Sequence, residues 1–209
     1  MKKLRVALTK GRLEKSAVSL FEGMGLDCGD LINKGRRLIL QVGEYEAVLA
    51  KAADVITYVE HGVCDVGIVG KDTIEEYGGD FYEVIDLGVG CCRFALAAPK
   101  GVDFFKGYSR KRVATKYPGV AKRYFDGKDM DVEIIKIEGS VELAPLLGLV
   151  DGIVDIVETG ATLRENGLEV VEEILPVSAR VIVNKASLKL RKSEIEKLLE
   201  QLEERSRVC

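Results

Sequence analysis

Gly152-Ile-Val-Asp155-Ile-Val-Glu158-Thr159-Gly160-Ala161-Thr162-Leu163 is the segment from which the architecture of this chain can be derived. Its first half, Ile153–Val157, is a short apolar run rich in β-branched residues, which is typical of a strand buried in a parallel sheet. Its second half turns through Thr159 and Gly160 into a helical pattern. A strand followed at once by a glycine turn and a helix is the repeating unit of an α/β protein.

Ten further apolar runs have the same short length and β-branched character. Strands are therefore also predicted at Leu4–Thr9, Leu38–Gln41, Ala47–Lys51, Val66–Val69, Val84–Val89, Phe94–Ala98, Val113–Thr115, Val132–Ile137, Val170–Leu175 and Ala179–Asn184. Helical patterns occur at Leu13–Met24, Ala53–His61, Val120–Phe125 and Val141–Leu149, and again after Ser193. In the last of these, Ser193 and Glu196 have the spacing of a capping box. The alternation predicts an α/β protein with mostly parallel strand pairing.

An internal echo indicates two similar halves. Gly62, Asp65 and Gly70 have the same spacing as Gly152, Asp155 and Gly160. A chance similarity of two strand–turn–helix segments explains this equally well. The alternative is two α/β lobes with a ligand cleft between them. The chain would cross between the lobes near residues 88–90 and near Pro176, which gives a discontinuous lobe I (1–88 plus 179–209) and a lobe II (89–178).

Composition excludes several classes of protein. With 209 residues and a 47% hydrophobic fraction, the chain suits one large or two small globular domains. Its 31 basic and 34 acidic residues give a net charge of -3, whereas a dedicated nucleic-acid binder is normally basic. No stretch approaches about 18 apolar residues, and the N-terminus lacks the apolar region of a signal peptide. We expect no nucleic acid and no membrane among the partners, and a cytoplasmic location.

The cysteines do not form a metal-binding pattern. The chain has five, none of them in a C-x-x-C pair, and its one histidine, His61, cannot complete a histidine-rich site. We therefore expect free thiols in a reducing compartment at Cys28, Cys64, Cys91, Cys92 and Cys209.

The turn at 158–163 has the chemistry of a phosphate site. Gly160 allows close backbone approach, Thr159 and Thr162 carry hydroxyls, and a helix start presents backbone N–H groups. Asp155 and Glu158 lie beside it as acceptors for sugar hydroxyls. A phosphate cradle next to two carboxylates suits a ribose 5-phosphate, although a Thr-capped helix without a ligand has the same pattern. The segment is neither a Walker A loop nor a dinucleotide fingerprint.

Three other predicted strand ends carry similar turns. Lys10-Gly11-Arg12 opens the first helix with two cations, which suits a polyanion because Arg binds phosphate oxygens through two N–H groups. Gly139 and Ser140 lie between a strand and a helix that Ser140 could cap. The third turn runs from Gly67 to Asp72. Each of these turns is also explained as an ordinary solvated connection.

As a set and in this order, the four segments closely resemble the ATP phosphoribosyltransferase family of histidine biosynthesis. The segments are Thr9-Lys-Gly-Arg-Leu13, Asp65-Val-Gly-Ile-Val-Gly70-Lys-Asp72, Glu138-Gly-Ser-Val-Glu142 and Asp155-Ile-Val-Glu-Thr-Gly-Ala-Thr-Leu163 with Asn166-Gly-Leu168. The resemblance covers nearly the whole chain. It implies two α/β lobes like those of type II periplasmic binding proteins. It also implies that adenine N1 of ATP is condensed with phosphoribosyl pyrophosphate (PRPP), which gives phosphoribosyl-ATP and pyrophosphate with Mg²⁺.

The resemblance also implies roles for individual residues. Asp155 and Glu158 would be catalytic, and PRPP would bind at Asp155, Glu158, Thr159, Gly160, Ala161, Thr162 and Leu163. ATP would bind at Lys10, Gly11, Arg12, Lys51, Gly70, Asp72, Gly139 and Ser140. We expect no direct side-chain ligand to Mg²⁺, which the substrate phosphates would hold. Adenine N1 has its own lone pair and needs no strong base, in agreement with the position of His61 outside all four segments.

The chain ends too early for the family's C-terminal regulatory domain and therefore resembles its short form. That form works with a regulatory subunit resembling histidyl-tRNA synthetase, as a homodimer within a hetero-oligomer. Two alternatives remain. A two-lobed binding or sensing module would share the fold without catalysis. An ordinary type I phosphoribosyltransferase would carry two adjacent acids before the loop, whereas Asp155 and Glu158 are three residues apart.

Overall fold

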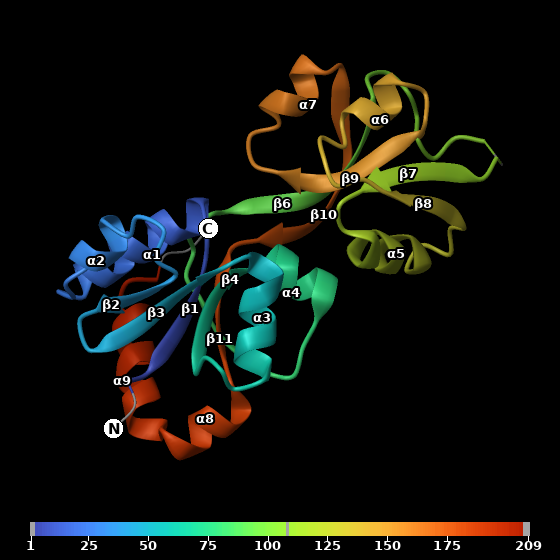
Figure 1. Cartoon of the computed structure of the whole chain (residues 1–209). Helices are drawn as coiled ribbons and strands as arrows, with labels where there is room; N and C mark the ends of the chain where they lie inside the picture. Colours follow the sequence, from blue (N-terminus) through green and yellow to red (C-terminus); the bar gives the residue numbers. More distant parts are fainter. Residues whose placement is uncertain (1–2, 108, 207–209) are drawn as a thin grey trace. The chain divides into compact units, whose positions relative to one another are not determined.

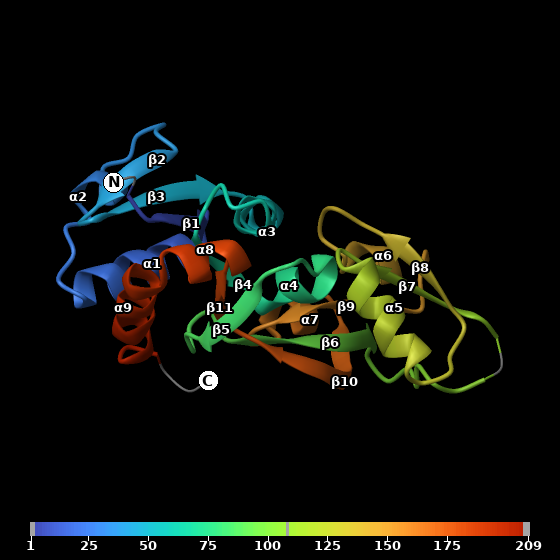
Figure 2. The same ribbon diagram turned by 90° about the horizontal axis from the view of Figure 1, so that it is seen from below.

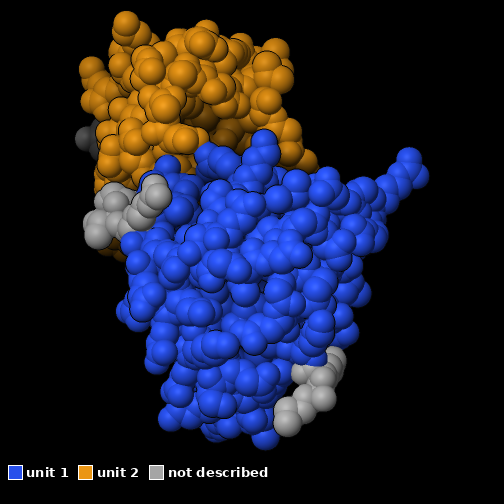
Figure 3. All heavy atoms as spheres, turned by 90° about the vertical axis from the view of Figure 1, so that its left-hand side faces the viewer, with its two compact units in different colours: residues 1–91, 178–209 blue, residues 92–177 orange. Residues whose placement is uncertain are grey.

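The computed structural model describes residues 3–107 and 109–206. The chain divides into two compact units, coloured separately in Figure 3: unit 1 is Met1–Cys91 with Ser178–Cys209, and unit 2 is Cys92–Val177. Each unit is built around its own sheet (Figure 1). A strand is found at each of the eleven predicted positions, within a few residues, so the α/β prediction is confirmed.

Unit 1 contains a six-stranded mixed sheet in the order β2-β3-β1-β4-β11-β5. Its strands are β1 (Arg5–Thr9), β2 (Ile39–Val42), β3 (Tyr45–Ala50), β4 (Val66–Gly70), β5 (Tyr82–Asp86) and β11 (Ala179–Val183). β1 pairs in parallel with β3 and β4, and the other strands are antiparallel to their neighbours. β11 therefore brings the C-terminal segment of the chain into the middle of the N-terminal sheet.

Helices cover both faces of this sheet. Val6 and Leu8 point from β1 into a core shared with α1 (Arg12–Gly23) and α9 (Lys192–Glu203), which both lie below β2 and β3 in Figure 2. Ala7 points to the opposite core, under α3 (Ala52–Glu60). This alternation explains why the strand is apolar at every interior position.

Unit 2 contains a five-stranded sheet in the order β10-β6-β9-β7-β8. The strands are β6 (Cys92–Pro99), β7 (Lys111–Thr115), β8 (Val132–Lys136), β9 (Gly152–Val157) and β10 (Leu168–Val177). β7 runs parallel to β8 and β9, whereas β6 is antiparallel to β9 and β10. α5 (Pro118–Asp126) covers one face, and the short helices α6 (Leu143–Leu146) and α7 (Ala161–Glu165) cover the other.

Both units contain the same topology. In unit 1 the strands β3-β1-β4-β11 pair as parallel, parallel and antiparallel, and in unit 2 the strands β8-β7-β9-β6 do the same. The sequence echo placed Asp65 opposite Asp155, and this alignment is wrong by four residues. The structural equivalent of Asp65 is Asp151. Each aspartate makes two hydrogen bonds with the backbone of an arginine. Arg5 N donates to Asp65 Oδ2 (2.9 Å), and Asp65 N donates to the Arg5 carbonyl (3.0 Å). In the same way Arg112 N donates to Asp151 Oδ2 (2.8 Å), and Asp151 N donates to the Arg112 carbonyl (2.9 Å).

Some local predictions fail for identifiable reasons. The Ser193–Glu196 capping box is wrong, because the N-cap of α9 is Arg191, two residues before Ser193, and it makes no side-chain cap. The helix predicted at Val141–Leu149 shrinks to Leu143–Leu146, with Glu142 rather than Ser140 at the N-cap. Three short helices had no predicted range: α2 (Gly29–Ile32), α4 (Lys71–Tyr77) and α8 (Lys185–Leu190). The last has a sequence signal, since Asn184 caps it through Ala186 N and Ser187 N.

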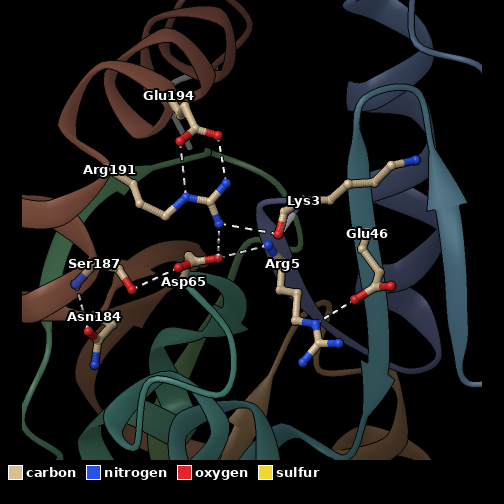
Figure 4. A network of polar contacts seen from close by, with 8 residues as sticks. All are labelled: Lys3, Arg5, Glu46, Asp65, Asn184, Ser187, Arg191 and Glu194. Carbon is tan, nitrogen blue, oxygen red and sulfur yellow. Dashed lines mark hydrogen bonds and ion pairs between the residues drawn. The ribbon is translucent and has the colours of Figure 1, made fainter. Parts of the chain in front are cut away.

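A polar network ties the start of β1 to the C-terminal helices (Figure 4). The half-buried Asp65 carboxylate accepts from Ser187 Oγ (2.8 Å) and Arg191 Nη1 (3.0 Å) as well as from Arg5 N. Arg191 also donates to both carboxylate oxygens of Glu194. The hydrogen bond from Arg191 lowers the pKa of the Glu194 carboxyl. These bonds hold the C-terminal segment on unit 1.

The cysteines are not all free. Cys28, Cys64 and Cys92 are reduced thiols, but Cys91 is disulfide-bonded, so the expectation of a free thiol is wrong there. Cys209 lies outside the described residues. Across residues 3–107 and 109–206, no helix is long and apolar enough to span a bilayer.

Candidate functional site

Almost all of the predicted site residues follow the carboxyl ends of parallel strands. In unit 1, Lys10-Gly11-Arg12 follows β1, Lys51 follows β3, and Gly70 ends β4. In unit 2, Gly139-Ser140 follows β8, and the turn 158–160 follows β9. The crevice outside the carboxyl ends of strands is where open α/β sheets bind ligands. The structure thus groups these residues at one edge of each sheet.

The turn after β9 has a backbone conformation that favours glycine. Gly160 is the N-cap of α7 with φ 72°, a left-handed conformation that side-chain-bearing residues adopt at a cost. Thr159 Oγ1 accepts a bond from Ala161 N (3.3 Å), and the Thr162 side chain is exposed. Leu163 differs from its neighbours because its side chain is buried in the core of unit 2. Any contact of Leu163 with a ligand is therefore restricted to its backbone.

Two arginines hold the carbonyl groups of this turn. Arg93 Nη1, from β6, donates to the Glu158 carbonyl oxygen (3.3 Å), and Arg164 Nη1 donates to that of Thr159 (3.0 Å). A carbonyl that is bound to a guanidinium does not point at an incoming anion, so these bonds favour exposure of the N–H side of the turn. Neither arginine was predicted as a site residue. The sequence signal for Arg164 is its position four residues after Gly160, about one helical turn away.

Asp155 and Glu158 occupy different environments. Asp155 is half-buried near the end of β9, opposite Ala95 of β6, whose small side chain leaves room beside the carboxylate. Glu158 follows the strand and is exposed. Both carboxylates lie within three residues of the turn 158–160.

A cavity of about 840 Å³ lies at the β1 carboxyl end of unit 1. It is lined by Lys10, Gly11, Arg12, Glu14, Lys15, Lys34, Gly35, Arg36, Arg37, Leu38 and Leu49. Six of these side chains are cationic, and one is a carboxylate. Such a concentration in a protein of net charge -3 creates a local positive potential that attracts polyanions. The predicted Lys10, Gly11 and Arg12 therefore lie together.

Half of the cavity's cations come from a turn that our sequence analysis missed. Lys34-Gly35-Arg36 repeats Lys10-Gly11-Arg12 letter for letter, and each glycine has a positive φ (57° and 98°). This repetition was a usable signal. Arg37 orders the second turn by donating to the Lys34 carbonyl (3.3 Å) and to Asp30 Oδ1 (3.0 Å). Arg36 makes no hydrogen bond or ion pair with the part of the chain that the structure describes.

The remaining predicted residues are not part of this cavity lining. Lys51 is the N-cap of α3, and Gly70 is the N-cap of α4, with Asp72 in the first turn of that helix. Gly139 and Ser140 belong to unit 2. Within residues 3–107 and 109–206, no group of three or more His, Cys, Asp or Glu side chains could hold a metal ion.

Comparison with known proteins identifies the type of enzyme. The profile of the HisG family, described as ATP phosphoribosyltransferase, matches residues 51–204. The chain is 59% identical over 204 residues to ATP phosphoribosyltransferase of Clostridium kluyveri, with 97% of this chain and 93% of the relative covered. It is 58% identical over 205 residues to that of Bacillus cytotoxicus, with 97% of each covered. These matches define an enzyme of the pentosyltransferase class.

Solved structures agree with this class. A chain of the ATP phosphoribosyltransferase HisG:HisZ complex from Thermotoga maritima superposes with a TM-score of 0.83 at 35% identity, covering 96% of this chain and 97% of that one. The chain belongs to the ATP phosphoribosyltransferase family. The Escherichia coli periplasmic sulphonate-binding protein SsuA superposes with a TM-score of 0.60 at 11% identity over 97% of this chain and 72% of that one. The second likeness shows the fold alone and confirms the prediction of two lobes of the periplasmic-binding type.

Proposed function

We propose that the chain binds PRPP at the turn after β9 and the phosphates of ATP in the basic cavity of unit 1, and transfers the phosphoribosyl group to adenine N1. The observation that carries this assignment is the cavity of six cations at the end of β1. Binding of an uncharged or monoanionic solute does not require six cations. A reaction between two polyphosphates does, because the repulsion between the two substrates must be offset.

Each group has a role in the transfer. The backbone N–H groups around Gly160 and the Thr162 hydroxyl bind the 5-phosphate of PRPP, and Asp155 and Glu158 accept bonds from the ribose hydroxyls. As pyrophosphate departs, positive charge develops on the ribose, and the half-buried Asp155 carboxylate stabilises it electrostatically. The N1 lone pair of adenine attacks the anomeric carbon directly. The bond from that carbon to pyrophosphate breaks with its electron pair.

We propose Mg²⁺ as the cofactor, chelated mainly by substrate phosphates. The phosphate oxygen atoms of the substrates are the hard ligands that suit this ion, and Asp155 and Glu158 remain with the ribose hydroxyls. When bound, Mg²⁺ neutralises charge on the departing pyrophosphate. We also propose a cytoplasmic location, where ATP is available.

The proposed reaction is tested by mixing the purified chain with ATP, PRPP and Mg²⁺ and following phosphoribosyl-ATP by its absorbance, with and without a HisZ-type protein. Product that requires all three reactants supports the assignment. If neither sample forms product while both substrates bind, the proposed placement of PRPP and ATP at these two sites would be wrong.

The cavity assignment predicts the behaviour of Arg12→Ala. We expect the KM for ATP to rise about tenfold, since a hydrogen bond to a charged group contributes roughly 1.5–3 kcal/mol. The increase should shrink at high salt, because the contact is electrostatic. The measurement is steady-state kinetics at two ionic strengths. Lys189→Ala, which removes one exposed charge from α8 outside the cavity, is the control. An effect of equal size at both salt concentrations would instead indicate a packing defect.

We propose a HisZ-type regulatory partner, resembling histidyl-tRNA synthetase, for a homodimer of this chain. The related T. maritima chain is part of a HisG:HisZ complex, and the chain covers 97% of that relative. Histidine should therefore inhibit the reconstituted complex and leave the isolated chain unaffected, because coupling between sites requires both proteins. The measurement is the enzyme activity at increasing histidine concentration, with and without the partner. Saturable inhibition of the pure chain would disprove the arrangement.

A further inference from the structure

Glu14 is the one carboxylate in the cavity, and its position is unusual. Its side chain is buried, with 8% of the residue exposed, although it is surrounded by lysines and arginines. Charged side chains are rarely buried unless they are paired. A buried carboxylate lowers the positive potential of the cavity, so its presence in a proposed phosphate site calls for a structural explanation.

Its contacts supply that reason. Glu14 Oε2 accepts from Gly11 N (3.4 Å), in the first Lys-Gly-Arg turn. Glu14 Oε1 accepts from Lys34 Nζ, in the second turn, 20 residues further along the chain. One carboxylate thus contacts both cation-bearing turns at once.

We propose that Glu14 is a positioning residue that holds the two Lys-Gly-Arg turns at a fixed separation, so that Arg12 and Arg36 bind one polyphosphate together. The inference rests on the proposed function of the cavity. A phosphate chain bound by two guanidinium groups requires both at set distances, and small displacements are costly. The second turn is ordered internally by Arg37, and the ion pair of Lys34 with Glu14 connects it to α1.

Two physical effects compete when the Glu14 charge is removed. Loss of a negative charge raises the potential of the cavity and would tighten anion binding. Loss of the Lys34 ion pair releases the second turn and would weaken anion binding. Under our proposal the second effect is larger. The sign of the change therefore separates a positioning role from a purely electrostatic one.

The test is a calorimetric titration with inorganic pyrophosphate on Glu14→Gln, which keeps the size of the side chain and an acceptor for Gly11 N. We expect the Kd to rise about tenfold with little change in melting temperature, and the KM for ATP to rise with it. Glu22→Gln, an exposed residue on the same helix, makes the same change in net charge and should bind as the wild type does. Because Glu14 acts through Lys34, adding Glu14→Gln to Lys34→Met should weaken binding little further. Glu14→Ala should weaken binding at least as much as Glu14→Gln.

Unchanged or tighter pyrophosphate binding by Glu14→Gln overturns the proposal. Arg36→Ala in the same titration distinguishes this from a failure of the proposed function. If Arg36→Ala weakens binding and Glu14→Gln does not, the cavity is a phosphate site without a positioning carboxylate. If wild-type protein does not bind pyrophosphate, or Arg36→Ala binds it normally, both the cavity assignment and the inference are wrong.

Discussion

Asp155→Asn should lower kcat about 100-fold while the protein folds normally. The substitution keeps the shape and hydrogen-bonding capacity of the side chain and removes only its charge. Preorganised groups that face developing charge typically contribute roughly 100- to 1,000-fold to kcat. The KM for PRPP should change much less, because the ribose hydroxyls keep an acceptor. The measurement is steady-state kinetics together with a thermal melt.

Glu165→Gln is the matched control for Asp155→Asn. Glu165 is an exposed acid at the end of α7, so the change in net charge is the same. Its kcat should equal that of the wild type. Full activity of Asp155→Asn would mean that this carboxylate has only a structural role, and equal losses in both variants would indicate a long-range charge effect.

Gly160→Ala should weaken PRPP binding on the order of 30-fold. The residue has φ 72°, and an added Cβ would lie 3.2 Å from Arg164 Nη1, within the turn that we propose binds the 5-phosphate. Displacing Arg164 also frees the Thr159 carbonyl, to which it is bonded. A hydrogen bond to a charged group contributes roughly 1.5–3 kcal/mol, so the loss of one or two such bonds gives an effect of this size.

Gly167→Ala separates backbone strain from ligand binding. Gly167 follows the other end of α7 with φ 68°, and an added Cβ there meets nothing within 4 Å. Both substitutions place an alanine in a left-handed conformation and should cost about 1 kcal/mol of stability. Only Gly160→Ala should lose PRPP affinity, measured by calorimetry. Equal PRPP affinity in the two variants would show that the 5-phosphate does not bind at this turn.

The strands were predictable because their signal is local. Each buried strand is apolar at consecutive positions, and this pattern does not depend on which other strand it contacts. The helix starts were less predictable. Ser193 has the right residue type for an N-cap, but Arg191 is bonded to Asp65 in a distant part of the chain, and the N-cap of α9 is Arg191, two residues earlier. Long-range contacts of this kind overrode the local preference.

The sequence could point to a candidate site where one segment contains all the chemistry. The turn 158–163 combines a strand end, a glycine, hydroxyls and carboxylates within a few residues. Only the first of the two turns that line the basic cavity was predicted. The second turn lies more than 20 residues further along the chain, and the two turns become neighbours only when the sheet forms. Arg93 was missed for the same reason: it reaches the Glu158 carbonyl from β6, which is 65 residues away in the sequence.

The position of β11 has a consequence for the order in which the protein can be made. β11 lies between β4 and β5, so the N-terminal sheet lacks an interior strand until residues 179–183 have left the ribosome. Unit 2 is continuous in sequence, has its own cores and is complete at Val177. During synthesis the middle of the chain can therefore reach its final fold while the earlier N-terminal segment is still waiting for its partner strand. β4 and β5 are therefore translated long before the strand that pairs with both of them.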